Sequence, residues 1–152
     1  MNLGDTAAAV GKGLFAGAAG TVAMTASSTL EAKLRKRGSS TAPADAAGKV
    51  LGVQPADEAG AARFSNVVHW SYGTSWGAVR GVLHVAGLRG AKAGAAHFAA
   101  VWGSAQVMLP ALDVAPPPWK SAPTEIAIDA FHHVVYAAAT GVAFAALERS
   151  SS

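Results

Sequence analysis

The sequence predicts an all-α integral membrane protein: a four-helix bundle in a single domain covering residues 1–152. Two observations predict this class. Charged residues make up only 14% of the chain, 51% of the residues are hydrophobic, and the mean hydropathy is +0.30, whereas soluble domains carry about 25% charged residues. In addition, four runs with little or no charge approach the roughly 20 residues that a helix needs to cross a bilayer.

The four runs contain one formal charge between them, that of Arg80, and they occupy residues 13–30, 64–88, 93–112 and 130–147. The predicted transmembrane helices extend these runs to about 8–34, 60–88, 91–112 and 122–148. Alanine supplies much of the apolar content, and alanine-rich helices insert into bilayers less readily than leucine-rich ones. The prediction therefore depends on the length of the runs and on their lack of charge.

The connections between the runs agree with this division. Residues 31–63 are basic and rich in Gly, Pro and Ser, so they predict a loop that is partly helical, with one short helix beginning near Pro43. Residues 89–92 predict a tight turn. The consecutive prolines within 113–125 cannot continue a helix, because proline lacks a donor and fixes φ. Trp119 beside Lys120 is typical of an interfacial anchor.

The basic run "KLRKR" at 33–37 predicts the orientation of the bundle and a contact with anionic lipids. It favours an arrangement with both termini outside. The first hydrophobic run could instead be a signal peptide cleaved after Ala26. Asp5 in its leading segment and the basic cluster that follows it favour a retained helix.

Each predicted helix carries a polar stripe when its residues are projected at 100° per residue. Ionisable groups in hydrocarbon are costly unless they face the bundle interior and pair. We therefore expect a polar seam in the core, with Arg80 close to Glu125 or Asp129, and with histidines bonded to Tyr72 or Tyr136. The residues of this seam are His69, Tyr72, Trp76, Arg80, His97, Glu125, Asp129, His132, His133 and Tyr136.

Two roles remain open for this seam. Chains of Asp, Glu and His inside membranes often mark proton paths, but the same residues also form structural hydrogen bonds. A metal site is the weaker alternative, because helical-bundle sites usually use two Glu-x-x-His pairs and this chain offers one Asp-x-x-His. The metal candidates are His69, His97, Asp129, His132 and His133. Haem ligation would join His69 or His97 to His132 or His133.

Other classes are excluded or disfavoured. The absence of cysteine excludes disulfides, thiolate zinc sites and cysteine nucleophiles. No nucleophile elbow or phosphate-binding glycine motif occurs, so no residue is assigned a catalytic role. The net charge of +3 is small and its basic residues are clustered, so we expect no nucleic-acid partner.

Glycines 73, 77 and 81 form a doubled GxxxG pattern. Helices in lipid associate through small residues that allow close backbone approach. The pattern therefore predicts a helix interface, which could serve a homo-oligomer or a larger membrane complex.

Residues 64–147 resemble the YagU family of small bacterial inner-membrane proteins. The resemblance lies in "VHWSYGTSWGAVRG", in "GAKAGAAHFAAVWGSAQVMLPALDVAPPPW" and in "SAPTEIAIDAFHHVVYAAATGV". It implies that the matching positions are His69, Pro110, Trp119, Glu125 and His132 or His133. It also implies a role linked to acid resistance, with no established catalytic residues. The N-terminal part of this chain departs from the family, whose members are longer there.

The sequence thus predicts a multi-pass protein of a bacterial cytoplasmic (inner) membrane, in contact with the lipid bilayer. We expect a non-enzymatic role in acid or envelope stress tolerance, or in assembly with a membrane partner, and no bound cofactor. The alternative is a metal- or haem-binding membrane protein, or a small membrane enzyme, that uses the same His/Asp/Glu cluster.

Overall fold

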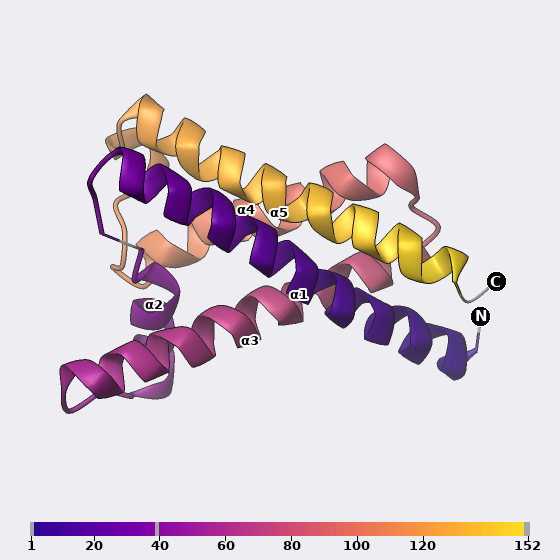
Figure 1. Cartoon of the computed structure of the whole chain (residues 1–152), viewed down its shortest axis with the longest axis horizontal. Helices are drawn as coiled ribbons and strands as arrows, with labels where there is room; N and C mark the ends of the chain where they lie inside the picture. Colours follow the sequence, from indigo (N-terminus) through magenta and orange to yellow (C-terminus); the bar gives the residue numbers. More distant parts are fainter. Residues whose placement is uncertain (1, 39, 151–152) are drawn as a thin grey trace.

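The computed structural model describes residues 2–38 and 40–150, and those residues form five α-helices, one short 3₁₀ helix and no strand. The expectation of an all-α chain is confirmed. The elements are α1 (Leu3–Leu34), α2 (Ala42–Leu51), α3 (Glu58–Val85), α4 (Gly90–Ala111), η1 (Pro118–Lys120) and α5 (Pro123–Arg149). Figure 1 shows the four long helices packed together, with α2 beside one end of them.

Local capping explains where the helices begin. The Asn2 side chain accepts a hydrogen bond from the Asp5 amide at 2.8 Å, so α1 starts at Leu3 and not near residue 8 as predicted. Asp57 caps α3 in the same way, through the Gly60 amide at 2.7 Å. α2 begins beside Pro43, at the predicted position, because proline suits the first turn of a helix.

α1 and α3 cross with their backbones in direct contact at glycines. A Cβ added to Gly77 would lie 2.1 Å from the Gly13 carbonyl oxygen, and one added to Gly17 would lie 2.6 Å from the Thr74 carbonyl oxygen. A Cβ on Gly81 would meet the Ala9 carbonyl oxygen at 2.3 Å. No side chain larger than hydrogen fits this crossing.

The doubled GxxxG pattern therefore serves an interface within the chain. Gly77 and Gly81 are buried against α1, and a Cβ on Gly73 would meet the Thr21 hydroxyl oxygen at 2.3 Å. The predicted helix interface is present, but its partner is α1. The expectation that these three glycines present a surface to a second copy or to another membrane protein is wrong in this structure.

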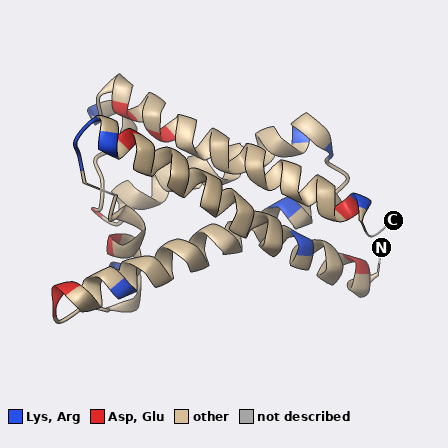
Figure 2. Ribbon diagram, viewed as in Figure 1, with Lys and Arg blue, Asp and Glu red and all other residues tan. Residues whose placement is uncertain are grey.

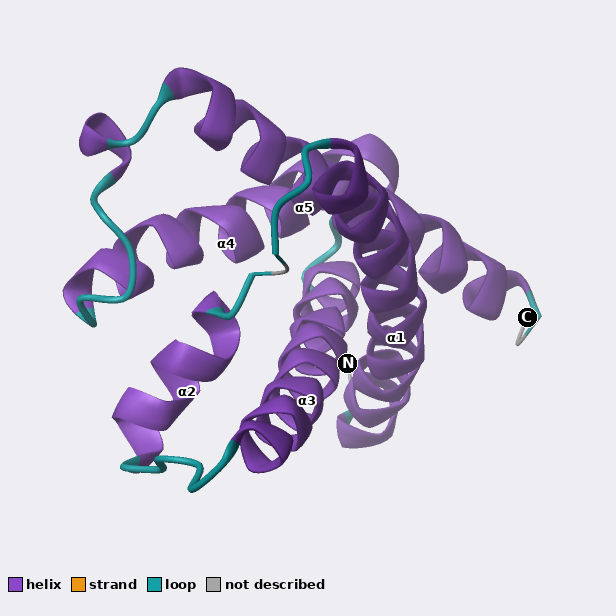
Figure 3. Cartoon of the chain, turned by 60° about the vertical axis from the view of Figure 1, so that its left-hand side comes forward, coloured by secondary structure: helices purple, strands orange, loops and turns teal. Residues whose placement is uncertain are grey.

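α1 is the central helix, because it packs against both α3 and α5. Its contact with α5 also depends on a glycine: a Cβ on Gly20 would lie 2.0 Å from the Thr140 hydroxyl oxygen. α4 packs chiefly on α5, and α2 lies against α3, as Figure 3 shows. The core is built mainly from alanines, with Tyr136 and Phe144 as its large buried side chains.

Charged residues gather at the two ends of the bundle and leave the middle of the helices without charge (Figure 2). Two helices, α1 and α5, are long and apolar enough to cross a membrane. The sequence predicted four helices long and apolar enough to cross a membrane, and this is confirmed for α1 and α5 only. α3 and α4 form where expected, but the polar residues along them, His69, Arg80, His97 and Gln106 among them, lower their hydropathy.

Replacing Gly77 by alanine is expected to destabilise the fold by about 1–3 kcal/mol, because the new methyl group overpacks the α1–α3 crossing. Thermal unfolding of the purified protein in detergent measures the effect. Gly103→Ala is the matched control, because a Cβ there meets nothing within 4 Å and alanine favours a helix over glycine. Equal stability of the two variants would contradict the close contact.

Candidate functional site

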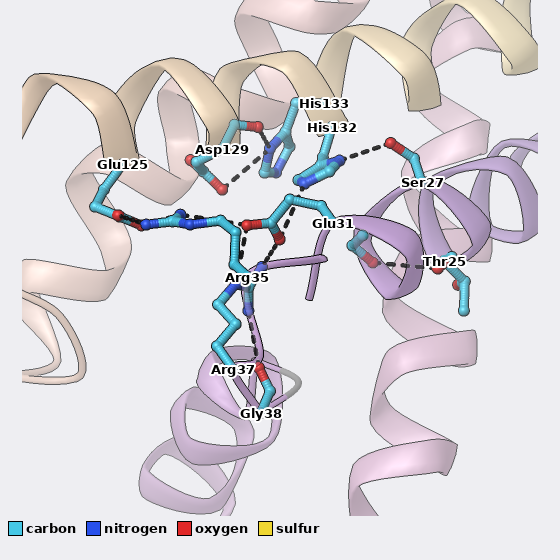
Figure 4. Close-up of polar contacts among 11 residues, drawn as sticks. Thr25, Ser27, Glu31, Arg35, Arg37, Gly38, Glu125, Asp129, His132 and His133 are labelled. Carbon is cyan, nitrogen blue, oxygen red and sulfur yellow. Dashed lines mark hydrogen bonds and ion pairs between the residues drawn. The ribbon is translucent and has the colours of Figure 1, made fainter. Parts of the chain in front are cut away.

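The ten residues of the predicted polar seam do not form one continuous site. The seam residues in the first turns of α5 lie at the end of the bundle where α1 ends (Figure 4); they are Glu125, Asp129, His132 and His133. His69, Tyr72, Trp76, His97 and Tyr136 lie along its middle. Arg80 lies toward the opposite end, near the C-terminal half of α5.

The densest group of polar contacts, which we name the Glu31 cluster, comprises Ser27, Glu31, Arg35, Arg37, Glu125 and His132 (Figure 4). The Glu31 carboxylate accepts hydrogen bonds from Arg35 at 3.2 Å and from Arg37 Nε at 3.1 Å, with a further contact from Arg37 Nη2. Both arginines follow α1 directly, where the chain turns at Arg35 and Lys36. These hydrogen bonds therefore hold the first residues of the α1–α2 connection against the last turn of α1.

Arg35 links this cluster to α5. Its Nη1 donates to Glu125 Oε2 at 3.1 Å, and its Nη2 donates to Glu125 Oε1. These bonds to Glu125, together with the one to Glu31, raise the pKa of the Arg35 guanidinium above its usual range. Glu125 is an exposed residue in the first turn of α5, and its partner is Arg35, not Arg80 as predicted.

His132 is the buried member of the cluster. Its side chain is only 6% exposed, and its Nδ1 shares a hydrogen bond of 2.7 Å with the Ser27 hydroxyl. The other ring nitrogen, Nε2, has no hydrogen-bond partner among the described residues and lies 3.7 Å from Glu31 Oε2. If this ring carried a positive charge, it would therefore form an ion pair with the Glu31 carboxylate, which Arg35 and Arg37 already contact.

Asp129 lies one turn beyond Glu125 on α5, and its side chain reaches α4. Asp129 Oδ2 accepts hydrogen bonds from Trp102 Nε1 at 2.9 Å and from Gln106 Nε2 at 3.2 Å. His133 Nδ1 donates to the Asp129 carbonyl oxygen on its own helix at 2.8 Å. Asp129 thus joins α5 to α4 through neutral donors, and the predicted pairing with Arg80 is absent.

The middle of the bundle holds single hydrogen bonds between helices. The Tyr136 hydroxyl donates to the Gly73 carbonyl oxygen at 2.6 Å, and His97 Nε2 donates to the Trp76 carbonyl oxygen at 3.0 Å. His69 Nε2 bonds to the Thr25 hydroxyl at 2.8 Å. The expected histidine bonds to Tyr72 or Tyr136 are not formed, although the His97 ring packs 5.5 Å from the ring of Tyr136.

Arg80 is buried and stacks its guanidinium over the ring of Phe144, 4.5 Å from the centroid. The predicted partners Glu125 and Asp129 both lie near the start of α5, whereas Phe144 lies near its end. An α-helix rises about 1.5 Å per residue, so some 15 residues separate the two levels by roughly 22 Å. At this end of the bundle Glu148 binds Lys12 at 2.6 Å and His84 at 2.9 Å.

The candidate metal ligands are also spread over the bundle and do not converge on one point. Among residues 2–38 and 40–150, no three His, Cys, Asp or Glu side chains are grouped so that they could hold a metal ion. His69 and His97 each bond to a different helix, and His132 bonds to Ser27. The geometry gives no support to the metal and haem alternatives.

Ser27 and Glu31 were not predicted as site residues, because at 100° per residue they lie outside the polar stripe of the first helix, which consists of Thr21, Thr25, Ser28 and Thr29. Arg35 and Arg37 were interpreted only as topology determinants and lipid contacts. A signal was present: Glu31 precedes Arg35 by four residues, the spacing of a helical ion pair.

Comparison with protein-family models, with curated proteins and with solved structures finds no match for this chain.

Tyr136→Phe is expected to lower the stability by about 1 kcal/mol, because it removes the hydrogen bond that joins α5 to the Gly73 carbonyl on α3. Unfolding in detergent measures the loss. Tyr72→Phe makes the same chemical change at a hydroxyl with no hydrogen bond among the described residues, and it keeps the edge contact with Trp76. A larger loss in Tyr72→Phe than in Tyr136→Phe would refute this assignment.

Proposed function

We propose that this chain is a multi-pass helical protein of a bacterial cytoplasmic membrane, in contact with lipid along the uncharged middle of its bundle. One observation carries this proposal: the most apolar windows of α1 and α5 are only 33% and 28% buried within the chain. A hydrophobic helix in a soluble protein is instead buried in the core.

The large side chains that face outward agree with this placement. Phe15 is 76% exposed, Val107 71% and Val142 71%, on three different helices. In a membrane, these side chains would contact lipid. The charges at both ends of the bundle are where the two water-facing surfaces of a membrane would lie (Figure 2).

The proposal extends to α3 and α4, which have 28 and 22 residues. At about 1.5 Å per residue, helices of this size reach roughly 33–42 Å, enough for a hydrocarbon core of about 30 Å. Their polar side chains His69, Arg80 and His97 are turned toward other helices. This arrangement satisfies the requirement that such groups avoid lipid.

Within this setting, we propose that the Glu31 cluster makes the packing of α1 on α5 respond to protons. Histidine is the side chain that gains its charge between about pH 8 and pH 5. His132 Nε2 faces the Glu31 carboxylate at 3.7 Å and has no other partner among the described residues. A proton on His132 therefore strengthens its attraction to α1, which favours the closed packing in acid.

A non-enzymatic role in acid or envelope stress tolerance follows from this proton response. The resemblance of residues 64–147 to the YagU family supports it independently, since that family is linked to acid resistance. Glu31 also holds the loop after α1 through Arg35 and Arg37. A change in the charge of His132 would therefore alter the position of this loop, which would contact the membrane surface or a partner protein.

Membrane placement is tested by washing cell membranes with alkaline carbonate, which strips peripheral proteins. The protein is expected to stay in the pellet and to enter solution only with detergent, because its exposed apolar side chains require an apolar environment. Recovery in the aqueous supernatant before any detergent is added would overturn the membrane proposal.

The proton response is tested by thermal unfolding of the detergent-solubilised protein between about pH 7 and pH 5. The unsubstituted protein is expected to be more stable at the acidic end of this range, because a positive charge on the His132 ring would lie 3.7 Å from the Glu31 carboxylate. His132→Gln and Glu31→Gln should each remove the same part of the pH dependence.

His69→Gln is the control for that experiment, because His69 bonds to the Thr25 hydroxyl and forms no ion pair with a carboxylate among the described residues. His84 beside Glu148 and His133 beside Asp129 also lie next to carboxylates, so each variant is compared with the unsubstituted protein. An unchanged pH profile in His132→Gln would contradict the assignment of His132.

A further inference from the structure

We infer that a groove between α1 and α3 is a binding site for one anionic phospholipid, with an acyl chain along the groove and the headgroup phosphate at Lys33. The inference rests on the membrane placement proposed above. It does not depend on the response of His132 to protons.

The groove is a depression of about 440 Å³ on the outer surface of the bundle. It follows one face of α1, and the indole of Trp70 on α3 lies on its other side. Its lining is Val22, Thr25, Ala26, Thr29, Leu30, Lys33 and Trp70. Along α1 these residues run from 22 to 33, which is about 16 Å of helix axis.

The groove exists because of the glycine crossing. α1 and α3 touch at Gly17 and Gly77 and then diverge toward the end of α1 and the start of α3 (Figure 1). The hydrogen bond between Thr25 and His69 joins the two helices on the way. Beside this bond, Trp70 of α3 and the α1 residues from Val22 to Lys33 line a depression on the surface of the bundle.

The distribution of polarity along the groove identifies the kind of molecule that fits it. Val22, Ala26 and Leu30 make most of the lining apolar, and its single formal charge, Lys33, stands at one end. Among the described residues Lys33 has no ion-pair partner, whereas Arg35 and Arg37 are both bound to carboxylates. An apolar channel that ends in an unpaired ammonium complements an amphiphile with an anionic head.

A phospholipid meets this description better than a helix of a second copy. Lys33 lies in the last turn of α1, and charged residues gather at the ends of the bundle (Figure 2), where the phosphates of a surrounding bilayer would lie. A helix packed in the groove would instead place apolar side chains against the Lys33 ammonium.

Native mass spectrometry of the full chain in detergent tests the site, with added phosphatidylglycerol or phosphatidylcholine of identical acyl chains. The unsubstituted protein is expected to retain phosphatidylglycerol in preference. Lys33→Gln should reduce that preference about fivefold, the factor expected for one basic side chain near a phosphate. Lys92→Gln, at an exposed lysine on the opposite end, should leave it unchanged.

Ala26→Trp fills the groove and is expected to reduce retention of both lipids at this site. Ala138→Trp, at an exposed alanine of α5, is the matched control. Equal retention of the two lipids by the unsubstituted protein, or full retention by Ala26→Trp, would overturn the inference. A change in oligomeric state with unchanged lipid retention in Ala26→Trp would assign the groove to a second copy.

These outcomes are separable from failure of the membrane proposal. A protein that stays in carbonate-washed membranes but shows no preference for phosphatidylglycerol refutes the lipid site alone. Unfolding midpoints of Lys33→Gln and Ala26→Trp, measured beside the unsubstituted protein, establish that each variant is folded before its lipids are counted.

Discussion

The backbone contact between α1 and α3 is the constraint on which the other features depend. Because Gly13, Gly17 and Gly77 have no side chain, the two helices touch and cross at a fixed level. α1 can then use Gly20, one turn further on, to approach α5. The end of α1 consequently lies beside the start of α5, which assembles the Glu31 cluster, and α1 and α3 diverge around the groove that ends at Lys33.

Three polar side chains in the middle of the bundle bond to neutral partners on other helices. Tyr136 and His97 donate to backbone carbonyls, and His69 bonds to a threonine hydroxyl. A single hydrogen bond of this kind joins two helices without burying a formal charge, which in an apolar environment is the less costly solution. Arg80 is the exception, because its charged guanidinium is buried: the aromatic face of Phe144 covers it, and its Nε and Nη1 atoms have no hydrogen-bond partner among the described residues.

Glu31 differs from these groups because three parts of the chain share its carboxylate. It lies on α1, binds Arg35 and Arg37 of the following loop, and faces His132 of α5. A change in the charge of His132 alters the interaction of Glu31 with both arginines, since all of them use the same two oxygen atoms. The buried ring and the exposed loop are thereby connected through one side chain.

The sequence by itself determined that this protein is all-α and where its long helices lie. The lack of charge in four runs, the prolines between them and the capping residues are local signals, so the four long helices and the short helix at Pro43 could be predicted within a few residues. The contacts that the polar side chains make between helices could not be predicted. Helical projection shows that Arg80 and Asp129 belong to polar stripes, but it leaves their levels along the bundle unknown. Those levels were decided by the glycine crossing, where the contact of two backbones fixes how one helix is placed against the next.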